Sequence, residues 1–336
     1  MKRIAIFQYD LSVGGIQKSL LNLLSNINTN KYKIDLYLFN DNNFYDTSHL
    51  KNVNFIKLKK LHLIFKFVPF KLLYLFYKTK ITKKYDVSID FNGYSNECAM
   101  NALKFNAKEK IIWVHNDVIK KYKNEYKYRI LWHLFNRKYY KFDKIVAVSK
   151  GAKEAFVLKT KINPNKVVVI PNFIDSKEII EKSKEECNLE VDNEYFNLVT
   201  VGRLCHQKGF DILIKDMSEI IKLRPKTRLY IIGDGNDRDK LQTLVKKYHL
   251  DDNIFFMGSQ KNPYKYIKKM DAFVLTSRYE GQGMVILEAK ILGLEIFISK
   301  HLEAYVDDVK GSDDLINDIV HASKTSNKEE NKLFSY

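Results

Sequence analysis

Short apolar runs alternate with longer amphipathic segments along the first half of the chain. The run RIAIF (residues 3–7) predicts a buried strand, and Gly14 and Gly15 follow it in a loop. A helix is expected next, because apolar residues recur there at helical spacing: Leu20, Leu21, Leu23, Leu24 and Ile27. The same apolar pattern predicts further strands at residues 33–39, 87–91, 110–115, 144–149 and 166–172. Strands that alternate with helices indicate a parallel, doubly wound α/β layer.

The second half of the chain restarts this pattern. Strands are predicted at residues 196–202, 228–235, 253–258 and 272–277, and a helix from about Asp211. We therefore expect an α/β protein with two Rossmann-like domains, at residues 1–172 and 195–320. A polar linker is expected at residues 173–194, and a polar tail at residues 321–336. Ligands in such sheets bind at the carboxyl ends of strands, so the site is expected in a central cleft between the two parallel sheets.

Positive charge is concentrated in the first half of the chain. Of the 336 residues, 57 are Lys or Arg and 40 are Asp or Glu. Residues 1–172 hold 32 basic and 12 acidic residues, whereas residues 173–336 hold 25 and 28. This asymmetry indicates an anionic surface or ligand beside the first half.

The cysteines and the apolar segments indicate a cytoplasmic protein. Three cysteines that lie far apart in the sequence make neither a disulfide framework nor a zinc site, which suits a reducing compartment. The apolar run at the start is too short for a signal peptide. The oily stretch 61–77 contains Lys66, Pro69 and Lys71, so it is not expected to span a bilayer.

The most informative segment is SRYEGQGMVILEAKILG, residues 277–293. A strand is expected to end in a loop with Glu280 and two glycines, and an apolar helix with Glu288 is expected from Met284 to about Gly293. Glycine lets the backbone turn tightly and approach a ligand. The N–H groups that open the helix then form an anion site.

The two glutamates of this segment suit the two ends of one long polyhydroxylated ligand. If the whole stretch were helical, Glu280 and Glu288 would lie about 12 Å apart along the axis. That exceeds the ~5 Å between the carboxylates of a retaining glycosidase. The alternative is that Glu280 caps a helix and Glu288 is a surface carboxylate, although Glu288 has apolar neighbours in the sequence.

Two cations are predicted to lie between a strand end and a helix start. Arg203 and Lys208 follow the strand at 196–202 and precede the helix near Asp211. Arginine can hold phosphate bidentately and lysine acts as a point charge, so together they could neutralise a diphosphate without a metal. The alternative is that both are solvated loop cations.

Taken with the glutamates, these motifs identify a family resemblance. The spacing of Glu280 and Glu288 around a glycine-rich turn resembles the signature of glycosyltransferase family 4, the group 1 glycosyltransferases, which have the GT-B fold. Three further segments are similar to the family: VGRLCHQKGFDILI (201–214), VVVIPNFID (167–175) and the first strand with Gly14 and Gly15. The resemblance covers about residues 1–320.

The resemblance implies a role for each matching residue. Arg203 and Lys208 would bind the donor diphosphate, Glu288 the ribose and Glu280 the hydroxyl groups of the donor sugar. Arg203, Lys208, Glu280 and His115 would be the catalytic residues. Further donor contacts would come from the first loop, from the base-binding loop at 258–262 and from backbone N–H groups of the turn: Gly14, Gly15, Gln260, Gly281, Gln282, Gly283, Met284 and Val285. The family often has an aromatic residue where this chain has Gln282. Neither a metal nor a cofactor is expected, only a nucleoside diphosphate sugar as substrate.

His115 is the candidate residue on the first domain. It ends the strand at 110–115 and precedes Asn116 and Asp117, which resemble a helix cap. A lone histidine at a strand end is commonly structural, but the resemblance implies a position near sugar and acceptor, where His115 would orient groups or relay a proton. Asn116 and Tyr94 are weaker acceptor-site candidates, and packing is the alternative for Tyr94.

Two other motifs do not carry the prediction. Asp237 and Asp239 have the spacing of a metal-binding pair, but they precede a helical pattern and are interpreted as acidic residues at a helix N-terminus. The segment Gly233-Asp234-Gly235 begins like a dinucleotide fingerprint, but Arg238 stands where the third glycine belongs.

Basic and aromatic residues are mixed in two segments of the first half. Residues 47–85 contain ten Lys and no Asp or Glu, and residues 119–144 contain nine Lys or Arg and two acids. This mixture suits an anionic membrane surface, and a solvated helix face is the alternative. No nucleic-acid-binding signature accompanies it, so nucleic acid is not an expected partner.

These observations predict a metal-independent retaining glycosyltransferase, peripheral on the cytoplasmic face of the membrane. It would pass a hexosyl-type sugar from a nucleoside diphosphate sugar to a hydroxyl of a lipid-linked or other glycan acceptor, such as capsule or O-antigen polysaccharide. Two alternatives stay open: a nucleotide-sugar epimerase of the same fold, and a non-catalytic protein that binds a membrane surface.

Overall fold

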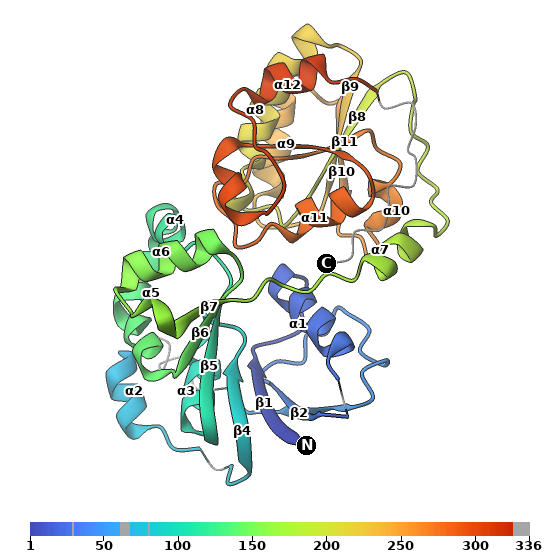
Figure 1. Cartoon of the computed structure of the whole chain (residues 1–336). Coiled ribbons are helices and arrows are strands. Elements are labelled where there is room, and N and C mark those ends of the chain that lie inside the picture. The colour runs from blue at the N-terminus through green and yellow to red at the C-terminus, as the bar shows by residue number, and fades with distance from the viewer. Residues whose placement is uncertain (29, 61–67, 80, 325–336) are drawn as a thin grey trace. The chain divides into compact units, whose positions relative to one another are not determined.

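The chain forms two units, Met1–Phe173 and Ile174–Tyr336, in a computed structural model (Figure 1). The structure describes residues 1–28, 30–60, 68–79 and 81–324. Lys66 and the tail from residue 325 therefore lie outside the described residues, and so does part of the oily stretch 61–77. Each unit is described by itself below.

In the described part of the first unit, seven parallel strands form one sheet in the order β3-β2-β1-β4-β5-β6-β7. The strands are β1 (Lys2–Gln8), β2 (Tyr32–Leu38), β3 (Val53–Lys57), β4 (Lys84–Asp90), β5 (Asn106–Val114), β6 (Lys144–Ala147) and β7 (Val167–Val169). All six predicted strands are confirmed. The edge strand β3 was not predicted, because only Val53 of its five residues is buried.

Helices cover both faces of this sheet. One face packs against α1 (Gly15–Asn26), whose buried leucines are those that predict the helix. The other face carries six further helical segments: α2 (Phe70–Phe76), α3 (Asn96–Lys104), α4 (Val118–Asn124), α5 (Tyr126–Phe135), η2 (Asn136–Lys141) and α6 (Lys150–Thr160). Aromatic side chains fill much of this second core, with Phe7, Tyr37 and Phe105 in mutual ring contact.

In the second unit, five described parallel strands form a sheet in the order β10-β9-β8-β11-β12. They are β8 (Phe196–Val201), β9 (Thr227–Ile232), β10 (Ile254–Gly258), β11 (Ala272–Leu275) and β12 (Glu295–Ile298). The four predicted strands are confirmed, and β12 is additional. Helices α8 (Phe210–Leu223), α9 (Arg238–Lys247) and α12 (Leu315–His321) cover one face. The other face carries α7 (Ser176–Ser183), α10 (Tyr264–Ile267) and α11 (Met284–Ile291).

The strand order reverses direction once in each sheet. In the first unit the chain builds outward from β1 through β2 to β3 and then returns to place β4 on the other side of β1. In the second unit β11 returns to the free side of β8 in the same way. The loops that leave the carboxyl ends of these neighbouring strands diverge to opposite faces of the sheet, and the resulting crevice is where ligands bind in such sheets.

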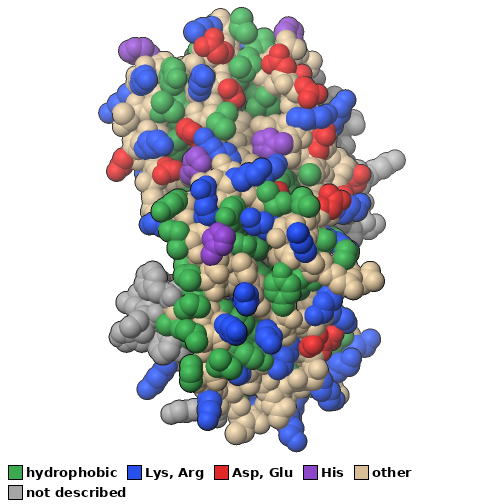
Figure 2. Space-filling view, turned by 90° about the vertical axis from the view of Figure 1, so that its left-hand side faces the viewer, with side chains coloured by type: hydrophobic (Ala, Val, Ile, Leu, Met, Phe, Trp, Pro, Cys, Tyr) green, Lys and Arg blue, Asp and Glu red, His purple; other side chains and the backbone are tan. Residues whose placement is uncertain are grey.

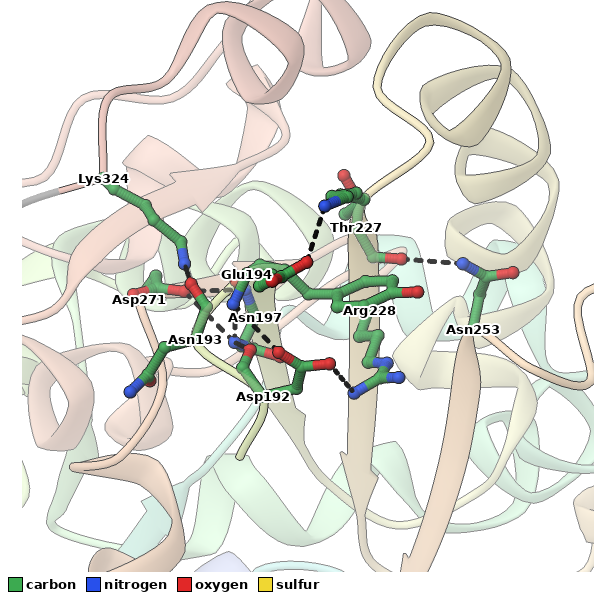
Figure 3. Close-up of polar contacts among 11 residues, drawn as sticks. Asp192, Asn193, Glu194, Asn197, Thr227, Arg228, Asn253, Asp271 and Lys324 are labelled. Atoms are coloured by element: carbon green, nitrogen blue, oxygen red, sulfur yellow. Dashed lines mark hydrogen bonds and ion pairs between the residues drawn. The ribbon is translucent and has the colours of Figure 1, made fainter. Parts of the chain in front are cut away.

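The segment predicted as a polar linker, residues 173–194, is structured. It contains α7, whose buried Ile179 belongs to the core of the second unit and which packs against α10 and α11. The last residues of the segment, 192–194, are tied to the amino end of the sheet, as Figure 3 shows. There the Asn197 side chain donates to the backbone oxygen of Asp192 at 3.0 Å, and Arg228 pairs with the Asp192 carboxylate at 3.5 Å. The sequence signal for this helix is the amphipathic spacing of apolar residues among charged ones, which the interpretation as a linker did not take into account.

Among the described residues, no helix combines the length and the apolar character needed to cross a membrane.

Replacing Ile179 should destabilise the second unit if α7 is part of its core. We expect Ile179→Ala to lower the free energy of unfolding by about 2–4 kcal/mol, the usual cost of emptying a buried isoleucine site. Ile180→Ala is the matched control, because Ile180 lies on the same helix and is only partly buried. Urea denaturation followed by circular dichroism measures both. Equal, small effects would show that α7 behaves as a linker.

Candidate active site

The loops after β8 and β11 meet at the crevice of the second unit. They bring together Lys208 and Glu280, which lie 72 residues apart in the sequence. The Lys208 ammonium donates to Glu280 Oε1 at 2.8 Å, and the Ser277 hydroxyl donates to the same oxygen at 2.7 Å. The pair is well shielded from solvent, since the Lys208 and Glu280 side chains are 16% and 8% exposed. A cation and a carboxylate therefore share one nearly buried position.

Backbone constraints force the two loops into close contact. Gly209 has a φ of +66°, and a Cβ atom there would lie 2.1 Å from the Thr276 carbonyl oxygen. The Thr276 hydroxyl donates to the Gly209 carbonyl at 2.9 Å. Only glycine fits this position, because any side chain would collide with the backbone of the other loop.

An arginine clamp fastens the same two loops on their outer side. The Arg278 guanidinium binds Asp211 bidentately, at 2.8 and 2.7 Å, and donates to the His206 carbonyl at 2.8 Å. The Gln207 side chain donates to the Tyr279 carbonyl at 3.1 Å. The hydrogen bonds from Arg278 lower the pKa of the Asp211 carboxyl, so Arg278 and Asp211 both stay charged at neutral pH. Lys208 is thereby presented from a turn that is braced on both sides.

Glu288 lies on α11 and is 5% exposed. Its Oε1 accepts a hydrogen bond from the Tyr264 hydroxyl at 3.1 Å, and Tyr264 begins the neighbouring α10. Glu280 is not a helix cap and Glu288 is not a surface carboxylate, so both alternative interpretations are wrong. Helix α11 starts at Met284 with Gly283 as its N-cap residue and no side-chain cap, Glu280 binds Lys208 instead, and Glu288 is buried.

The turn from Gly281 to Val285 leads directly into α11. Gly281, Gln282 and Gly283 are buried, while Met284 and Val285 are partly exposed. Gly283 has a φ of +66°, and a Cβ atom there would meet Ile286 and Val306 at 2.8 and 2.9 Å. Helix α11 is therefore entered through a tight glycine turn that follows Glu280 directly.

The other predicted donor residues lie near strand ends of the same sheet. Arg203 is exposed and follows β8. Gln260 lies beyond β10, and its amide donates to the Met257 carbonyl at 2.7 Å. The Asp237–Asp239 interpretation is confirmed, because α9 begins at Arg238 with Asp237 as its N-cap residue. Within the part of the chain that the structure describes, no three His, Cys, Asp or Glu side chains gather as a metal site would require.

In the first unit, the loop after β1 leads into α1. Asp10 organises it, since its Oδ1 accepts hydrogen bonds from the Ser12 hydroxyl at 2.7 Å and the Gln17 amide at 3.1 Å. Helix α1 begins at Gly15, and nothing lies within 4 Å of where a Cβ of Gly15 would be. The backbone at Gly15 can therefore be approached closely, whereas the Gly14 amide and carbonyl both lie 3.3 Å from the Tyr45 hydroxyl.

The turn after β4 is held by two buried side chains, Lys138 and Asp90. The Lys138 ammonium donates to the Gly93 carbonyl at 2.8 Å, and Asp90 accepts from the Gly93 amide at 2.9 Å. Gly93 has a φ of +70°, and a Cβ there would lie 2.3 Å from the Trp113 carbonyl oxygen. Burial raises the pKa of Asp90 to about 6, although the Lys138 charge opposes the shift. Asp90 and Lys138 thus fix the loop that carries Tyr94.

His115 is buried at the end of β5. Its Nε2 donates to the Phe91 carbonyl at 2.5 Å, and its ring packs on the Phe91 ring. Burial lowers the pKa of His115 to about 4, so the imidazole is neutral at neutral pH. Because Nε2 carries the proton in this arrangement, Nδ1 is the basic nitrogen.

Tyr94 and Asn116 are in contact. The Asn116 amide donates to the Tyr94 hydroxyl at 2.9 Å, and Lys121 lies 4.2 Å from the centre of the Tyr94 ring. Asp117 caps α4 by accepting from the Lys120 amide at 2.8 Å, as its position in the sequence predicts. The structure therefore places the acceptor candidates on adjoining loops after β4 and β5.

Several residues of these networks were missed from the sequence. They share the property of supporting a predicted residue or the loop that carries it: Asp90, Lys138, Asp211, Tyr264, Ser277 and Arg278. Ser277 and Arg278 lie in the recognised motif, and Asp90 is a polar end of an apolar strand, so those three had a signal. The other three had none, because their partners are known only from the fold.

Two family models match the chain. The model described as "Glycosyltransferase Family 4" matches residues 13–178, and that described as "Glycosyl transferases group 1" matches residues 180–310.

Curated relatives carry the same description. An uncharacterized glycosyltransferase of Methanocaldococcus jannaschii is 31% identical over 68% of this chain, and the chain covers 59% of that protein's length. The N-acetylgalactosamine-N,N'-diacetylbacillosaminyl-diphospho-undecaprenol 4-alpha-N-acetylgalactosaminyltransferase of Campylobacter jejuni is 28% identical, over 90% of this chain and 81% of the relative.

Solved structures share the GT-B fold. Anabaena HepE, in complex with UDP and glucose, matches with a TM-score of 0.64 at 17% identity, covering 89% of this chain and 81% of HepE. S. aureus TarM, in a complex that includes UDP, matches with a TM-score of 0.67 at 15% identity, covering 95% and 91%. The two parallel sheets are thus those of the GT-B fold.

The buried Asp90 and His115 should give the first unit opposite pH dependences of stability. The folded state binds a proton more tightly at Asp90, so the Asp90 contribution to the free energy of unfolding falls as pH rises from about 4 to 6. The folded state binds a proton less tightly at His115, so that contribution rises from about pH 4 to 6.5. Each shift corresponds to roughly 3 kcal/mol.

As pH rises from 4 to 6, we therefore expect the free energy of unfolding of Asp90→Asn to increase relative to that of the wild type. That of His115→Gln should decrease relative to the wild type over the same range. Denaturant titrations followed by tryptophan fluorescence measure this, since both tryptophans (Trp113 and Trp132) lie in the first unit. Parallel pH profiles for the wild type and both variants would contradict the assignment.

Proposed function

This chain belongs to the group 1 glycosyltransferases of family 4, and we propose that it transfers a sugar from a nucleoside diphosphate sugar to a hydroxyl group. The observation that carries the proposal is the Lys208–Glu280 pair at the crevice of the second sheet. A cation there matches a diphosphate, and an adjacent carboxylate matches sugar hydroxyls. The residues that would bind one donor molecule therefore lie where such a sheet binds ligands.

Each part of the donor has a candidate partner in the second unit. Lys208 and Arg203 would bind the diphosphate, and the N–H groups that open α11 would add to the same anion site. Glu288, oriented by Tyr264, would bind the ribose hydroxyls. Glu280 would bind hydroxyls of the sugar, and the backbone near Gln260 would contact the base.

The reaction would retain the anomeric configuration, with the acceptor attacking on the face from which the diphosphate leaves. The leaving diphosphate would assist deprotonation of the acceptor hydroxyl. Lys208 and Arg203 would stabilise the charge that develops on it, a role that preorganised cations fill without a metal ion. The bracing of the Lys208 turn by Arg278 supports this, because a fixed cation needs no reorganisation during the reaction.

On the first unit, uncharged polar groups would meet the acceptor and the sugar. Neutral His115 would orient a hydroxyl or relay a proton, and Tyr94 and Asn116 would contact the acceptor. Gly14 and Gly15 would let the donor approach the backbone.

We propose a lipid-linked surface glycan as the acceptor and the cytoplasmic face of the membrane as the place of reaction. The Campylobacter relative is named for a diphospho-undecaprenol acceptor. In this chain, α2 and α5 both pack against η2 and together expose apolar side chains: Leu72, Leu75, Phe76, Tyr126, Ile130, Leu131 and Tyr140. The same helical segments and α4 also carry exposed basic residues: Lys71, Lys123, Lys127, Arg129, Arg137 and Lys141.

This basic apolar face suits an anionic bilayer. Figure 2 shows hydrophobic and basic side chains intermixed, with few acidic ones, over the lower half of the view. Each Lys or Arg close to an anionic bilayer contributes about 1 kcal/mol, and inserted apolar side chains add a salt-independent part. A helix face that is merely solvated would expose fewer large apolar side chains than the face of α2 does. On α2, the Leu75 and Phe76 residues are 63% and 78% exposed.

Donor kinetics test the proposed roles. We expect Lys208→Ala to slow transfer by at least ~100-fold, about 2.7 kcal/mol, because the leaving diphosphate loses its fixed cation. Glu288→Gln should chiefly raise KM for the donor, since a ribose contact acts alike in ground and transition states. Lys215→Ala is the matched control, an exposed lysine on α8.

The assay would use a panel of nucleoside diphosphate sugars with and without acceptor, and product analysis. A chelator should leave the rate unchanged. Epimerised sugar formed without acceptor would favour the epimerase alternative, and activity lost in chelator and restored by manganese would contradict the metal-free mechanism.

Flotation with anionic vesicles tests the membrane proposal. We expect the wild type to float at low salt and to be partly released by salt. Lys71→Glu with Lys127→Glu should remove the salt-sensitive part, and Leu75→Ser with Phe76→Ser the salt-resistant part. Leu223→Ser, a 66% exposed leucine of the second unit, should change nothing. A wild type that stays wholly in solution at low salt would favour a soluble glycan acceptor.

A further inference from the structure

The Lys208 ammonium already has a charged partner before any ligand binds. Its Nζ lies 2.8 Å from Glu280 Oε1, and its methylene chain lies over the backbone of Gly202, where a Cβ would approach it to 3.0 Å. The Ser277 hydroxyl donates to the same Glu280 oxygen. Lys208 and Glu280 are therefore held together, and a diphosphate that reaches Lys208 must also come close to the Glu280 carboxylate.

The carboxylate treats the two diphosphate species of the reaction differently. An ionised carboxylate only accepts hydrogen bonds, sugar hydroxyls can donate them, and phosphate oxygens of an anion cannot. A free nucleoside diphosphate ends in a monoester phosphate with a second pKa of about 6, so it carries an additional negative charge at neutral pH. In the sugar conjugate that terminal oxygen is esterified, and hydroxyl groups replace the charge.

We propose that Glu280 is a specificity-determining residue that makes the site prefer the nucleoside diphosphate sugar over the free nucleoside diphosphate, and so favours release of the by-product. This inference rests on the proposed function. Glu280 repels the terminal phosphate of the by-product and competes with it for Lys208, whereas it accepts hydrogen bonds from the sugar of the donor. Like charges at close range in a shielded site are strongly unfavourable.

Glu288 has a different environment and serves as the internal comparison. Its Oε1 accepts a hydrogen bond from the neutral Tyr264 hydroxyl. Glu288 lies on α11, whereas Lys208 lies in the loop after β8. A ribose contact through Glu288 is common to both ligands, so changing it should weaken both alike.

Calorimetric titration of the wild type, Glu280→Gln and Glu288→Gln tests the inference. The probes are UDP, GDP and ADP and the glucose and N-acetylglucosamine conjugates of each. One nucleoside diphosphate and its sugar conjugate, both of which bind the wild type, are then titrated into the variants. In Glu280→Gln we expect the free nucleoside diphosphate to bind at least ~10-fold more tightly and the conjugate to bind more weakly, because the amide is neutral and can donate. Glu288→Gln should weaken both by a similar factor.

Glu280→Ala is a second variant if the glutamine variant is unstable, and thermal unfolding checks both. Unchanged or weaker binding of the free nucleoside diphosphate to a folded Glu280 variant would overturn the inference while leaving the proposed function intact. If none of the nine probes binds the wild type, the proposed function fails first. In turnover assays, by-product inhibition should likewise become at least ~10-fold stronger in Glu280→Gln.

Discussion

The single reversal of strand order in each sheet is the constraint on which the site depends. Parallel strands place all their carboxyl ends on one edge, and the reversal makes β8 and β11 neighbours there although their loops are far apart in the sequence. Only this arrangement brings the Lys208 turn against the Glu280 turn. The same reversal in the first unit makes β1 and β4 neighbours, so the glycine loop and the Gly93 turn leave the sheet beside each other.

Placing charges at such an edge creates a second constraint, because a shielded charge must be paired. Lys208 is paired with Glu280, and Arg278 with Asp211, so the cations of the second unit do not stand isolated at low exposure. The pairing also removes freedom from the loops, since Gly209 and Thr276 leave no space between them. Helix α7 extends this rigidity by packing against the helix that carries Glu288.

The elements were predictable where the physical signal is local. Ten strands follow from runs of buried apolar residues, and the motif glutamates follow from glycines beside a helix start. The edge strand β3 and the linker helix α7 were missed, because their burial is one-sided and their composition is polar. The partners of the site residues were missed for a different reason. A bidentate contact between Arg278 and Asp211 spans 67 residues and depends on strand order, which no local pattern contains.

The candidate residues at the carboxyl ends of the strands are charged in the second unit and uncharged in the first. This is so although the first unit carries most of the positive charge. In the second unit the edge presents paired charges, which suit a diphosphate and its hydroxylated sugar. In the first unit burial lowers the pKa of His115 to about 4, which keeps its imidazole neutral at neutral pH, and Tyr94 and Asn116 add uncharged polar groups. The basic residues of the first unit lie instead on the surface of α2, α5 and η2. A neutral polar edge suits a hydroxyl nucleophile, because a strong local charge would bias its protonation before transfer. The exposed basic residues of the first unit therefore belong to its outer surface, and its candidate acceptor residues His115, Tyr94 and Asn116 are uncharged.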